Sequence, residues 1–148
     1  MYKDRVNWQS QCRTLPKLRT FLQFKDFYSD APHTFKPLSF FQRKQISKFR
    51  LGMLQLRIET GRYFRIAAED RICQTCNMGQ VEDETHFLLH CNTYQQNRQQ
   101  LFENIPDIDN FVALTDQDKL KLLLNDRSMV KKTSIFIAES FDHRSTII

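Results

Sequence analysis

Four residues in the middle of the chain are spaced like the ligands of a zinc ion. They follow the pattern Cys-x2-Cys-x9-His-x4-Cys and are Cys73, Cys76, His86 and Cys91. Two cysteines separated by two residues can point both thiolates at one ion from a tight turn, and the later His and Cys complete a tetrahedron. Asn77 and Gly79 supply the residues that a chain reversal there requires. The pattern predicts one structural zinc, because four protein ligands leave no open position for catalysis.

Other interpretations of these residues stay open at this stage. Cysteine is among the residues most often buried, so the cysteines can be core side chains. The Cys-x2-Cys pair would be a redox couple only in a βαβ context, which this sequence lacks. A disulfide is disfavoured because nothing marks the chain as secreted. His90 adjoins Cys91 and is an alternative to His86 if the local helix turns differently. The remaining cysteine, Cys12, is expected to be a free thiol.

Length and composition favour a small helical domain. The chain has 148 residues, 41% of them hydrophobic, and 13 Phe, which is enough for one packed core. Only 3 Gly and 4 Pro interrupt it, so helices are favoured over a β architecture with many turns. We expect a mainly α fold, held by one structural zinc knuckle, with little or no sheet. Within a single domain the expected parts are an N-terminal arm and short helix (1–36), a long basic helix and connector (37–69), the knuckle and its following helix (70–103), and C-terminal helices (104–148).

Charge and hydropathy restrict the partners. The net charge of +5 makes a polyanionic partner plausible. The N-terminus lacks the apolar segment of a signal peptide, and no apolar run approaches the length of about 18 residues that indicates a membrane span. We therefore expect an intracellular protein, nuclear or cytoplasmic, without a membrane association or a small-molecule substrate.

The longest helical pattern covers residues 38–60. Pro37 precedes it and Gly61 follows it, which is the usual asymmetry of helix ends. At the helical period its apolar residues form two stripes, so the helix is expected to pack on two sides. The first stripe is Leu38, Phe41, Phe49, Met53 and Leu56, and the second is Phe40, Leu51, Leu54 and Ile58.

A line of arginines lies between these stripes. Arg43, Arg50 and Arg57 are seven residues apart, which is a step of about 10.5 Å along one helix face. Arg62 and Arg65 continue the positive charge in the connector, residues 61–69, where Tyr63 or Phe64 can stack on an unpaired base. These arginines are candidate contacts to nucleic-acid phosphates. The alternative is a solvated face whose arginines pair with acids such as Glu69, Asp70 or Glu82.

Shorter patterns predict the other helices. Asp83 is expected to cap a helix from Glu84 that carries His86. The Thr115-x-x-Asp118 sequence resembles a capping box. The remaining predicted helices cover residues 1–15, 15–28, 93–102, 110–114, 119–124 and 129–141, and the first is expected to dock through Trp8. The residues expected to face inward are Leu18, Phe21, Leu22, Phe24 and Phe27 in the second; Tyr94, Leu101 and Phe102 in the third; and Ile135, Phe136, Ala138 and Phe141 in the last. Leu22 and Phe24 alternate, so they also suit a strand.

Several motifs occur together around the zinc pattern. They are Lys48-Phe49-Arg50-Leu51, Arg57-Ile58-Glu59-Thr60-Gly61-Arg62-Tyr63, Arg71-Ile72-Cys73-x-x-Cys76, Val81-Glu82-Asp83-Glu84-x-His86-Phe87-Leu88-Leu89-x-Cys91, Tyr94 and Arg98. Together they resemble the region downstream of the polymerase in non-LTR (LINE-like) retrotransposon reverse transcriptases. The resemblance runs from about residue 17 to the C-terminus, and beyond residue 102 it is only a helical pattern. It implies a CCHC zinc knuckle in an isolated fragment. Asn92 departs from the family, which commonly has Pro there.

The catalytic motifs of such elements are missing. The chain has no Tyr-x-Asp-Asp motif, so we expect no polymerase activity. Pro106-Asp107 resembles the start of the endonuclease motif that some relatives carry after the knuckle. However, Asp116 and Asp118 follow too soon and Asp126 too late, so Pro106-Asp107 is expected to be a loop.

Three functions are weighed on this basis. The favoured one is a non-catalytic module that binds RNA or DNA through Arg43, Arg50, Arg57, Arg62 and Arg65. The alternative is a structural remnant or protein-interaction domain in which zinc serves only the fold. A zinc deaminase would place His-x-Glu before Pro-Cys-x-x-Cys, and here the order is reversed. We therefore expect no enzyme.

Overall fold

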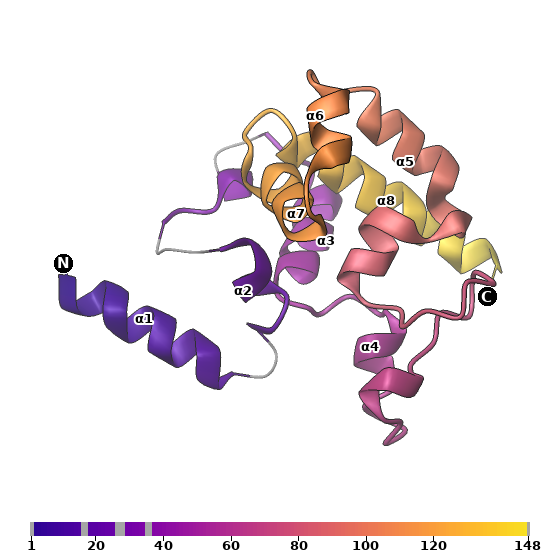
Figure 1. Ribbon diagram of the computed structural model, residues 1–148, viewed down its shortest axis with the longest axis horizontal. Coiled ribbons are helices and arrows are strands. Elements are labelled where there is room, and N and C mark those ends of the chain that lie inside the picture. The colour runs from indigo at the N-terminus through magenta and orange to yellow at the C-terminus, as the bar shows by residue number, and fades with distance from the viewer. Residues whose placement is uncertain (1, 16–17, 26–28, 35–36, 148) are drawn as a thin grey trace.

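The computed structural model describes residues 2–15, 18–25, 29–34 and 37–147, and these residues fold into helices without a strand (Figure 1). A single β-bridge within these ranges joins Ile72 and Val81. The prediction of a mainly α fold is confirmed. The α-helices are α1 (Tyr2–Thr14), α2 (Phe21–Phe24), α3 (Phe40–Arg50), α4 (Arg57–Thr60), α5 (Gln95–Phe102), α6 (Ile108–Ala113), α7 (Asp116–Asn125) and α8 (Val130–Ile147). Short 3-10 turns cover Pro32–Thr34, Ala68–Asp70 and Asn92–Tyr94, and a π-helical turn covers His86–His90.

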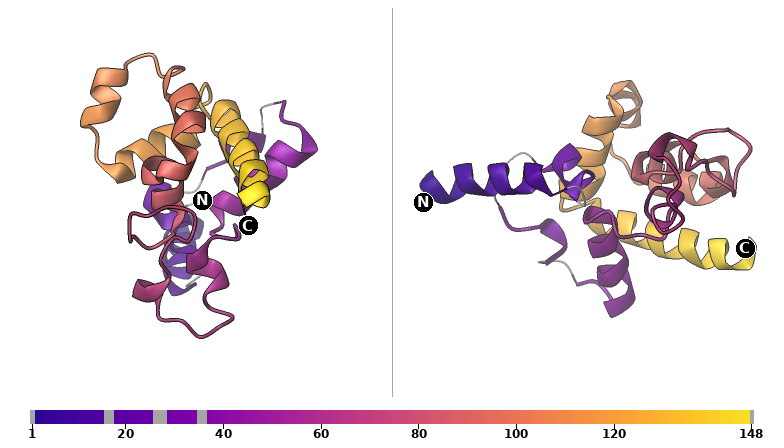
Figure 2. Two further views of the ribbon diagram at one scale, coloured as in Figure 1. Left: turned by 90° about the vertical axis from the view of Figure 1, so that its right-hand side faces the viewer. Right: turned by 90° about the horizontal axis from the view of Figure 1, so that it is seen from below.

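The C-terminal helix α8 lies at the centre of the packing. It contacts α3, α5 and α7, as the views of Figure 2 also show. Its inward residues Val130, Phe136 and Ile137 are buried. Phe87 of the metal-site segment packs against the same helix, with ring centroids 5.6 Å from Phe136 and 5.4 Å from Phe141. The helical core and the candidate metal site therefore share one set of apolar contacts.

The predicted continuous helix over residues 38–60 is wrong. The helix α3 begins after Ser39, whose side chain forms a capping box with Gln42, and it ends at Arg50. Gly52 follows with a φ of 62°, which favours glycine. The Gly52 amide donates to the Phe49 carbonyl at 3.0 Å, and the Met53 amide donates to the Lys48 carbonyl at 2.8 Å. These two bonds form a Schellman motif, which terminates the helix.

The break also changes which side chains are buried. Phe49, Leu54 and Leu56 are buried as predicted. Both predicted stripes lose residues to the surface, two in the first turn of α3 and two in the turn that ends it. The predicted inward residues that are exposed instead are Phe40, Phe41, Leu51 and Met53.

Arg50 is a buried part of the core. Only 2% of it is exposed. Its Nη1 donates to the Leu124 carbonyl at 2.7 Å, and its guanidinium lies 4.6 Å from the centroid of the Phe24 ring. Burial lowers the pKa of Arg50 to about 10. The residue predicted as the middle phosphate contact instead joins α2, α3 and α7.

His33 lies close to this buried charge and predicts a pH dependence of stability. Its Nε2 is 3.3 Å from Ser47 Oγ. Burial and the positive charges of Arg50, Arg43 and Lys25 lower the pKa of His33 to about 4. The unfolded chain binds this proton near pH 6.5, whereas the folded chain does not until about pH 4. The contribution of His33 to the free energy of unfolding is therefore fully present above pH 6.5 and is lost as the pH falls toward 4.

We expect protonation of His33 to lower the free energy of unfolding by about 1–2 kcal/mol between pH 6.5 and 5, where few carboxylates titrate. Urea unfolding of the chain and of His33→Gln over this interval measures it. The variant keeps a hydrogen-bonding side chain but does not titrate, so its stability should fall less. Equal pH profiles for the two proteins would contradict the assignment.

The remaining helices follow the predicted signals. Thr115 caps α7 and Asp83 caps the helical segment that carries His86. Asp107 is the N-cap of α6, so Pro106-Asp107 does lie in a loop at a helix start. The α8 helix continues to Ile147, beyond the predicted end at Phe141.

At the N-terminal end, Trp8 packs edge-on against Phe21, as expected for the docking of α1. Leu22 and Phe24, for which a strand was an alternative, lie in α2. Phe27 lies outside the described residues. Among the helices that the structure describes, none has the length and apolar character needed to cross a membrane.

Candidate metal centre

The structure brings the four predicted ligands together. The ligand atoms of Cys73, Cys76, His86 and Cys91 all lie within 4.8 Å of one another. The Sγ atoms of Cys73 and Cys91 are 3.9 Å apart, and Cys76 Sγ is 3.4 Å from His86 Nε2. A tetrahedral zinc site has edges of about 3.8 Å between sulfurs and about 3.6 Å between sulfur and nitrogen. The donor set therefore fits one tetrahedral ion, and its sulfurs are too far apart for a disulfide.

The first two ligands are held by a tight reversal of the chain. The Cys73 amide donates to the Gln80 carbonyl at 2.8 Å, and the Ile72–Val81 bridge closes the base of the turn. Gly79 has a φ of 65°, so the glycine predicted for this turn is required by its backbone. Thr75 lies between the two cysteines, with its hydroxyl 3.2 Å from Cys73 Sγ.

The second pair of ligands depends on the π-helical turn His86–His90. An α-helix advances about 100° per residue, so residues five apart would lie about 140° apart around the axis. In the π turn the Cys91 amide donates to the His86 carbonyl at 2.7 Å. This hydrogen bond brings Cys91 back beneath His86. The four-residue gap between the two ligands therefore suits a π turn, a feature often found at functional sites.

Hydrogen bonds distinguish His86 from His90. His86 Nδ1 lies 3.0 Å from the Gln80 side-chain oxygen, which leaves Nε2 directed at the cluster. Such a partner fixes the tautomer and the ring orientation of a metal-binding histidine. His90 Nε2 instead lies 2.7 Å from Asp116 Oδ2, outside the cluster. The geometry thus favours His86 over the alternative that the sequence left open.

The two buried sulfurs titrate as a pair. A hydrogen bond from Cys73 lowers the pKa of Cys91 to about 6. The same hydrogen bond, together with burial, raises the pKa of Cys73 to about 11. Near neutral pH the pair therefore shares one proton, which a bound cation would displace.

Two arginines near the cluster donate to backbone carbonyls and not to the ligand atoms. Arg98 is buried and donates to three carbonyls, those of Phe87, Leu88 and Cys91. Arg71 donates to the carbonyls of Ile58 at 2.7 Å and Ile66 at 2.7 Å. The hydrogen bonds of both arginines go to backbone carbonyls. The hydrogen bonds of Arg98 stabilise the end of the π turn, and those of Arg71 stabilise the connector.

A buried ion pair ties α8 to the same site. Glu82 is 1% exposed, and its Oε1 lies 3.5 Å from Cys73 Sγ. Arg144 donates to both carboxylate oxygens of Glu82. The backbone amide of Arg57 also donates to Glu82, at 2.8 Å. Glu82 and Arg144, like Gln80 and Thr75, were not predicted as site residues. Glu82 belongs to a motif that the sequence analysis identified, but nothing in the sequence connected it to Arg144, 62 positions away.

Arg43, Arg50 and Arg57, which were predicted to share one helix face, do not form one exposed line. Arg43 is exposed on α3, Arg50 is buried, and Arg57 is partly buried at the start of α4. Arg62 and Arg65 are exposed in the connector. Arg62 pairs with Glu59 at 3.1 Å, a partner that the sequence did not indicate. The line required a continuous helix, and the turn at Gly52 removes it.

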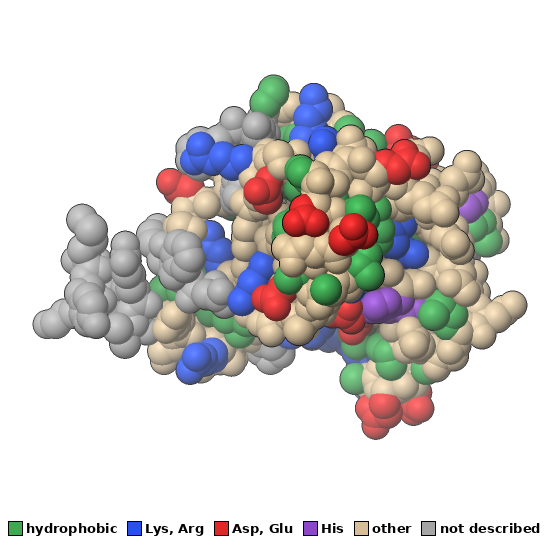
Figure 3. Space-filling model, turned by 45° about the horizontal axis from the view of Figure 1, so that its top comes forward, with side chains coloured by type: hydrophobic (Ala, Val, Ile, Leu, Met, Phe, Trp, Pro, Cys, Tyr) green, Lys and Arg blue, Asp and Glu red, His purple; other side chains and the backbone are tan. Residues whose placement is uncertain are grey.

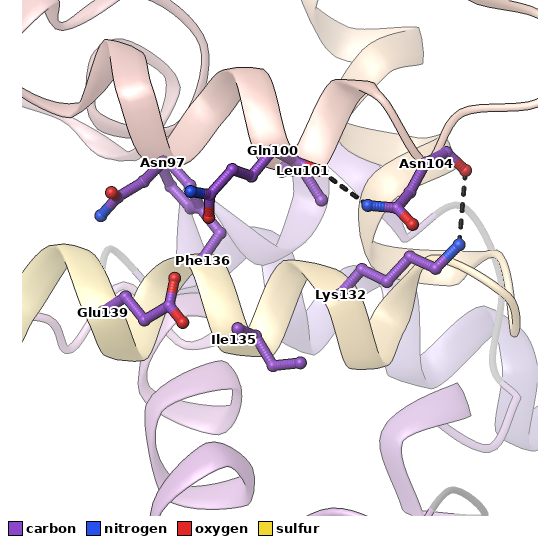
Figure 4. A pocket seen from close by; sticks show the side chains of 8 residues that line it. All are labelled: Asn97, Gln100, Leu101, Asn104, Lys132, Ile135, Phe136 and Glu139. Atoms are coloured by element: carbon purple, nitrogen blue, oxygen red, sulfur yellow. Dashed lines mark hydrogen bonds between the residues drawn. The ribbon is translucent and has the colours of Figure 1, made fainter.

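A separate cavity of about 250 Å³ lies between α5 and α8 (Figure 4). Polar side chains of both helices line it, and Leu101, Ile135 and Phe136 contribute apolar surface. The Lys132 ammonium lies 3.4 Å from the Asn104 carbonyl. No cysteine or histidine lines this cavity, so it is distinct from the metal cluster.

Comparison of the chain with protein-family models, curated proteins and solved structures finds no match. The geometry of the described residues therefore carries the functional argument.

Proposed function

We propose that the chain is a non-catalytic zinc-binding module that binds single-stranded RNA or DNA, and that it derives from the C-terminal region of a non-LTR retrotransposon reverse transcriptase. The observation that carries the binding proposal is the tip of the connector, residues 62–65. There two exposed aromatic side chains stand between two exposed arginines.

The donor set argues for zinc as the bound ion. Three thiolates and one imidazole nitrogen in a tetrahedral arrangement suit zinc better than the oxygen-seeking ions magnesium and calcium. With the imidazole neutral, the bound site carries a formal charge of −1. The ion would cross-link the 73–76 turn to the helical segment that ends at Cys91. Four protein ligands fill the tetrahedron, which supports a structural and non-catalytic role.

The connector tip has the side chains that a single strand needs. Tyr63 is 78% exposed and Phe64 is 72% exposed, far more than packing aromatics normally are. Exposed aromatics offer a stacking surface to any unpaired base, and flanking arginines attract phosphates. Arg65 has a φ of 56°, an unusual value for a residue other than glycine, asparagine or aspartate. Strained backbone of this kind is concentrated at functional sites.

The metal cluster and the connector tip are mechanically linked. Arg71 lies two residues before Cys73 and donates to carbonyls that flank the tip, those of Ile58 in α4 and Ile66 in the connector. Gly61 permits this, since a Cβ there would lie 2.7 Å from Arg71 Cγ. The Ile58 amide also donates to the Glu82 carbonyl at 3.0 Å. A zinc-held knuckle would therefore fix the base of the connector and present its tip.

The alternative function is a structural remnant or a protein-interaction domain in which zinc serves only the fold. Its support is the modest charge surplus of the chain and the burial of Arg50 in the core. Binding to nucleic acid that weakens with salt distinguishes the two functions.

Substitutions at the connector tip test the proposal. We expect Tyr63→Ala/Phe64→Ala to weaken binding to a fluorescent oligonucleotide by about 1–3 kcal/mol per stacked base, with the salt dependence unchanged. Arg62→Gln/Arg65→Gln should instead lower the slope of log K against log salt by about 0.7 for each lost contact. Arg43→Gln reports on the exposed arginine of α3 in the same way. Fluorescence anisotropy over a salt series measures all three.

Matched controls exclude a general loss of aromatic surface or charge. Phe40→Ala removes an aromatic side chain that is 83% exposed on α3, and Lys131→Gln removes an exposed charge of α8. Both should bind like the parent chain. Parent-like binding by the two connector variants would exclude residues 62–65 as the contact. If the parent chain showed no salt-dependent binding to the oligonucleotide, the nucleic-acid function would be excluded and the structural or protein-interaction function would remain.

A further inference from the structure

A second surface differs from the rest of the chain in both charge and apolar exposure. Residues 99–118 contain five acids and no base, although the whole chain has a net charge of +5. In Figure 3, which brings the top of Figure 1 forward, acidic side chains gather around exposed hydrophobic ones. The α5 and α6 helices lie at that top (Figure 1).

An open groove of about 540 Å³ occupies this surface. Ile108 and Val112 lie one helical turn apart on α6, and they are 39% and 63% exposed. Phe102 and Ile105 line the groove from the end of α5 and the turn that follows, and Gln99 and Glu103 complete the lining. We call these six residues the α5–α6 groove.

The acids around the groove are available to a partner. Within the described ranges, neither Glu103 nor Asp109 has a side-chain hydrogen bond or an ion pair. The first base after the acidic stretch, Lys119, is placed over the Phe111 ring at 5.8 Å from its centroid. The apolar groove thus keeps a net negative rim, which would repel nucleic-acid phosphates.

We infer that the α5–α6 groove docks a basic amphipathic helix of a partner protein. Apolar side chains spaced one turn apart on that helix would enter between Ile108, Val112 and Phe102. Lysines or arginines beside them would face Glu103 and Asp109, and this opposite charge would favour a basic partner over a neutral one. The inference does not depend on the proposed zinc or nucleic-acid binding.

A model peptide tests the groove. The probe is a leucine–lysine peptide of about 18 residues with leucines at the i, i+3, i+4 and i+7 positions, which form one apolar stripe. A peptide with the same composition in scrambled order and a leucine–glutamate peptide serve as comparisons. We expect the full-length chain to bind the first peptide and to bind the other two at least about tenfold more weakly in fluorescence anisotropy.

Surface variants locate the binding. Val112→Lys removes an apolar contact and reverses the local charge, so it should weaken binding about tenfold or more. Met53→Lys is the matched control, because Met53 is 51% exposed in the turn after α3. Glu103→Gln/Asp109→Asn should weaken binding at low salt, and the difference should shrink as salt screens the charges.

Three results would overturn the inference. The first is equal binding of the scrambled peptide, which would indicate unspecific charge attraction. The second is an equal effect of Met53→Lys and Val112→Lys. The third is self-association of the chain that Val112→Lys abolishes, because the occupant of the groove would then be a second copy.

Discussion

Cys91→Ser should lose the metal and unfold the region around it. Cys91 is fully buried, and its sulfur lies at the meeting point of the turn, the π helix and the core. A structural zinc contributes apparent binding energy of about 10–16 kcal/mol, against a net stability of about 5–15 kcal/mol for a whole domain. We therefore expect the melting temperature to fall by about 10 °C or more. Thermal unfolding followed by circular dichroism, together with metal analysis, measures both effects.

Two variants serve as controls for this experiment. Cys12→Ser changes a buried thiol outside the cluster, and His90→Ala removes the neighbouring imidazole that bonds to Asp116. Both should keep the metal and lose less than about 2 kcal/mol of stability. If Cys91→Ser melted with the parent chain, the cluster would contribute nothing to the fold.

Phe87→Ala should cause the largest loss of stability among the core substitutions. Its ring centroid lies 4.9 Å from that of Tyr94, 5.6 Å from Phe136 and 5.4 Å from Phe141. It also follows the ligand His86 directly, so the cavity would open beside the metal cluster. A buried Phe→Ala change costs about 3–5 kcal/mol through lost transfer energy and the cavity left behind.

Denaturant unfolding of the zinc-loaded protein measures this cost. Phe40→Ala is the matched control, since that ring is 83% exposed and its removal should change stability by less than about 0.5 kcal/mol. Similar unfolding free energies for Phe87→Ala and Phe40→Ala would contradict the placement of Phe87 at the centre of the core.

The ligand set and most helices were predictable because their signals are local. The spacing of the cysteines fits a single turn, and Thr115 and Asp83 cap helices through side chains three residues away from their partners. The π turn was not predictable from periodicity, because it differs from an α turn by only one residue per hydrogen bond. The four-residue gap between His86 and Cys91 in the sequence was the only signal of the π turn.

The prediction that Arg43, Arg50 and Arg57 share one exposed helix face failed, because charge alone does not determine exposure. Gly52 was visible as a helix stop, yet the apolar period continued past it and favoured one long helix. Arg50, the last residue of α3, contacts the Phe24 ring and the Leu124 carbonyl, partners 26 and 74 residues away that periodicity cannot identify. The same limit applies to Arg144, whose partner Glu82 lies 62 residues earlier in the chain.

Metal content tests the central claim most directly. The chain is purified under reducing conditions without added metal, and native mass spectrometry is compared for the parent, His86→Ala and His90→Ala proteins. One zinc per chain is expected in the parent and in His90→Ala, and none in His86→Ala. Cobalt exchanged into the parent should give the absorption of a tetrahedral thiolate site. A folded parent without metal, whose melting temperature is the same with and without zinc, would contradict the account.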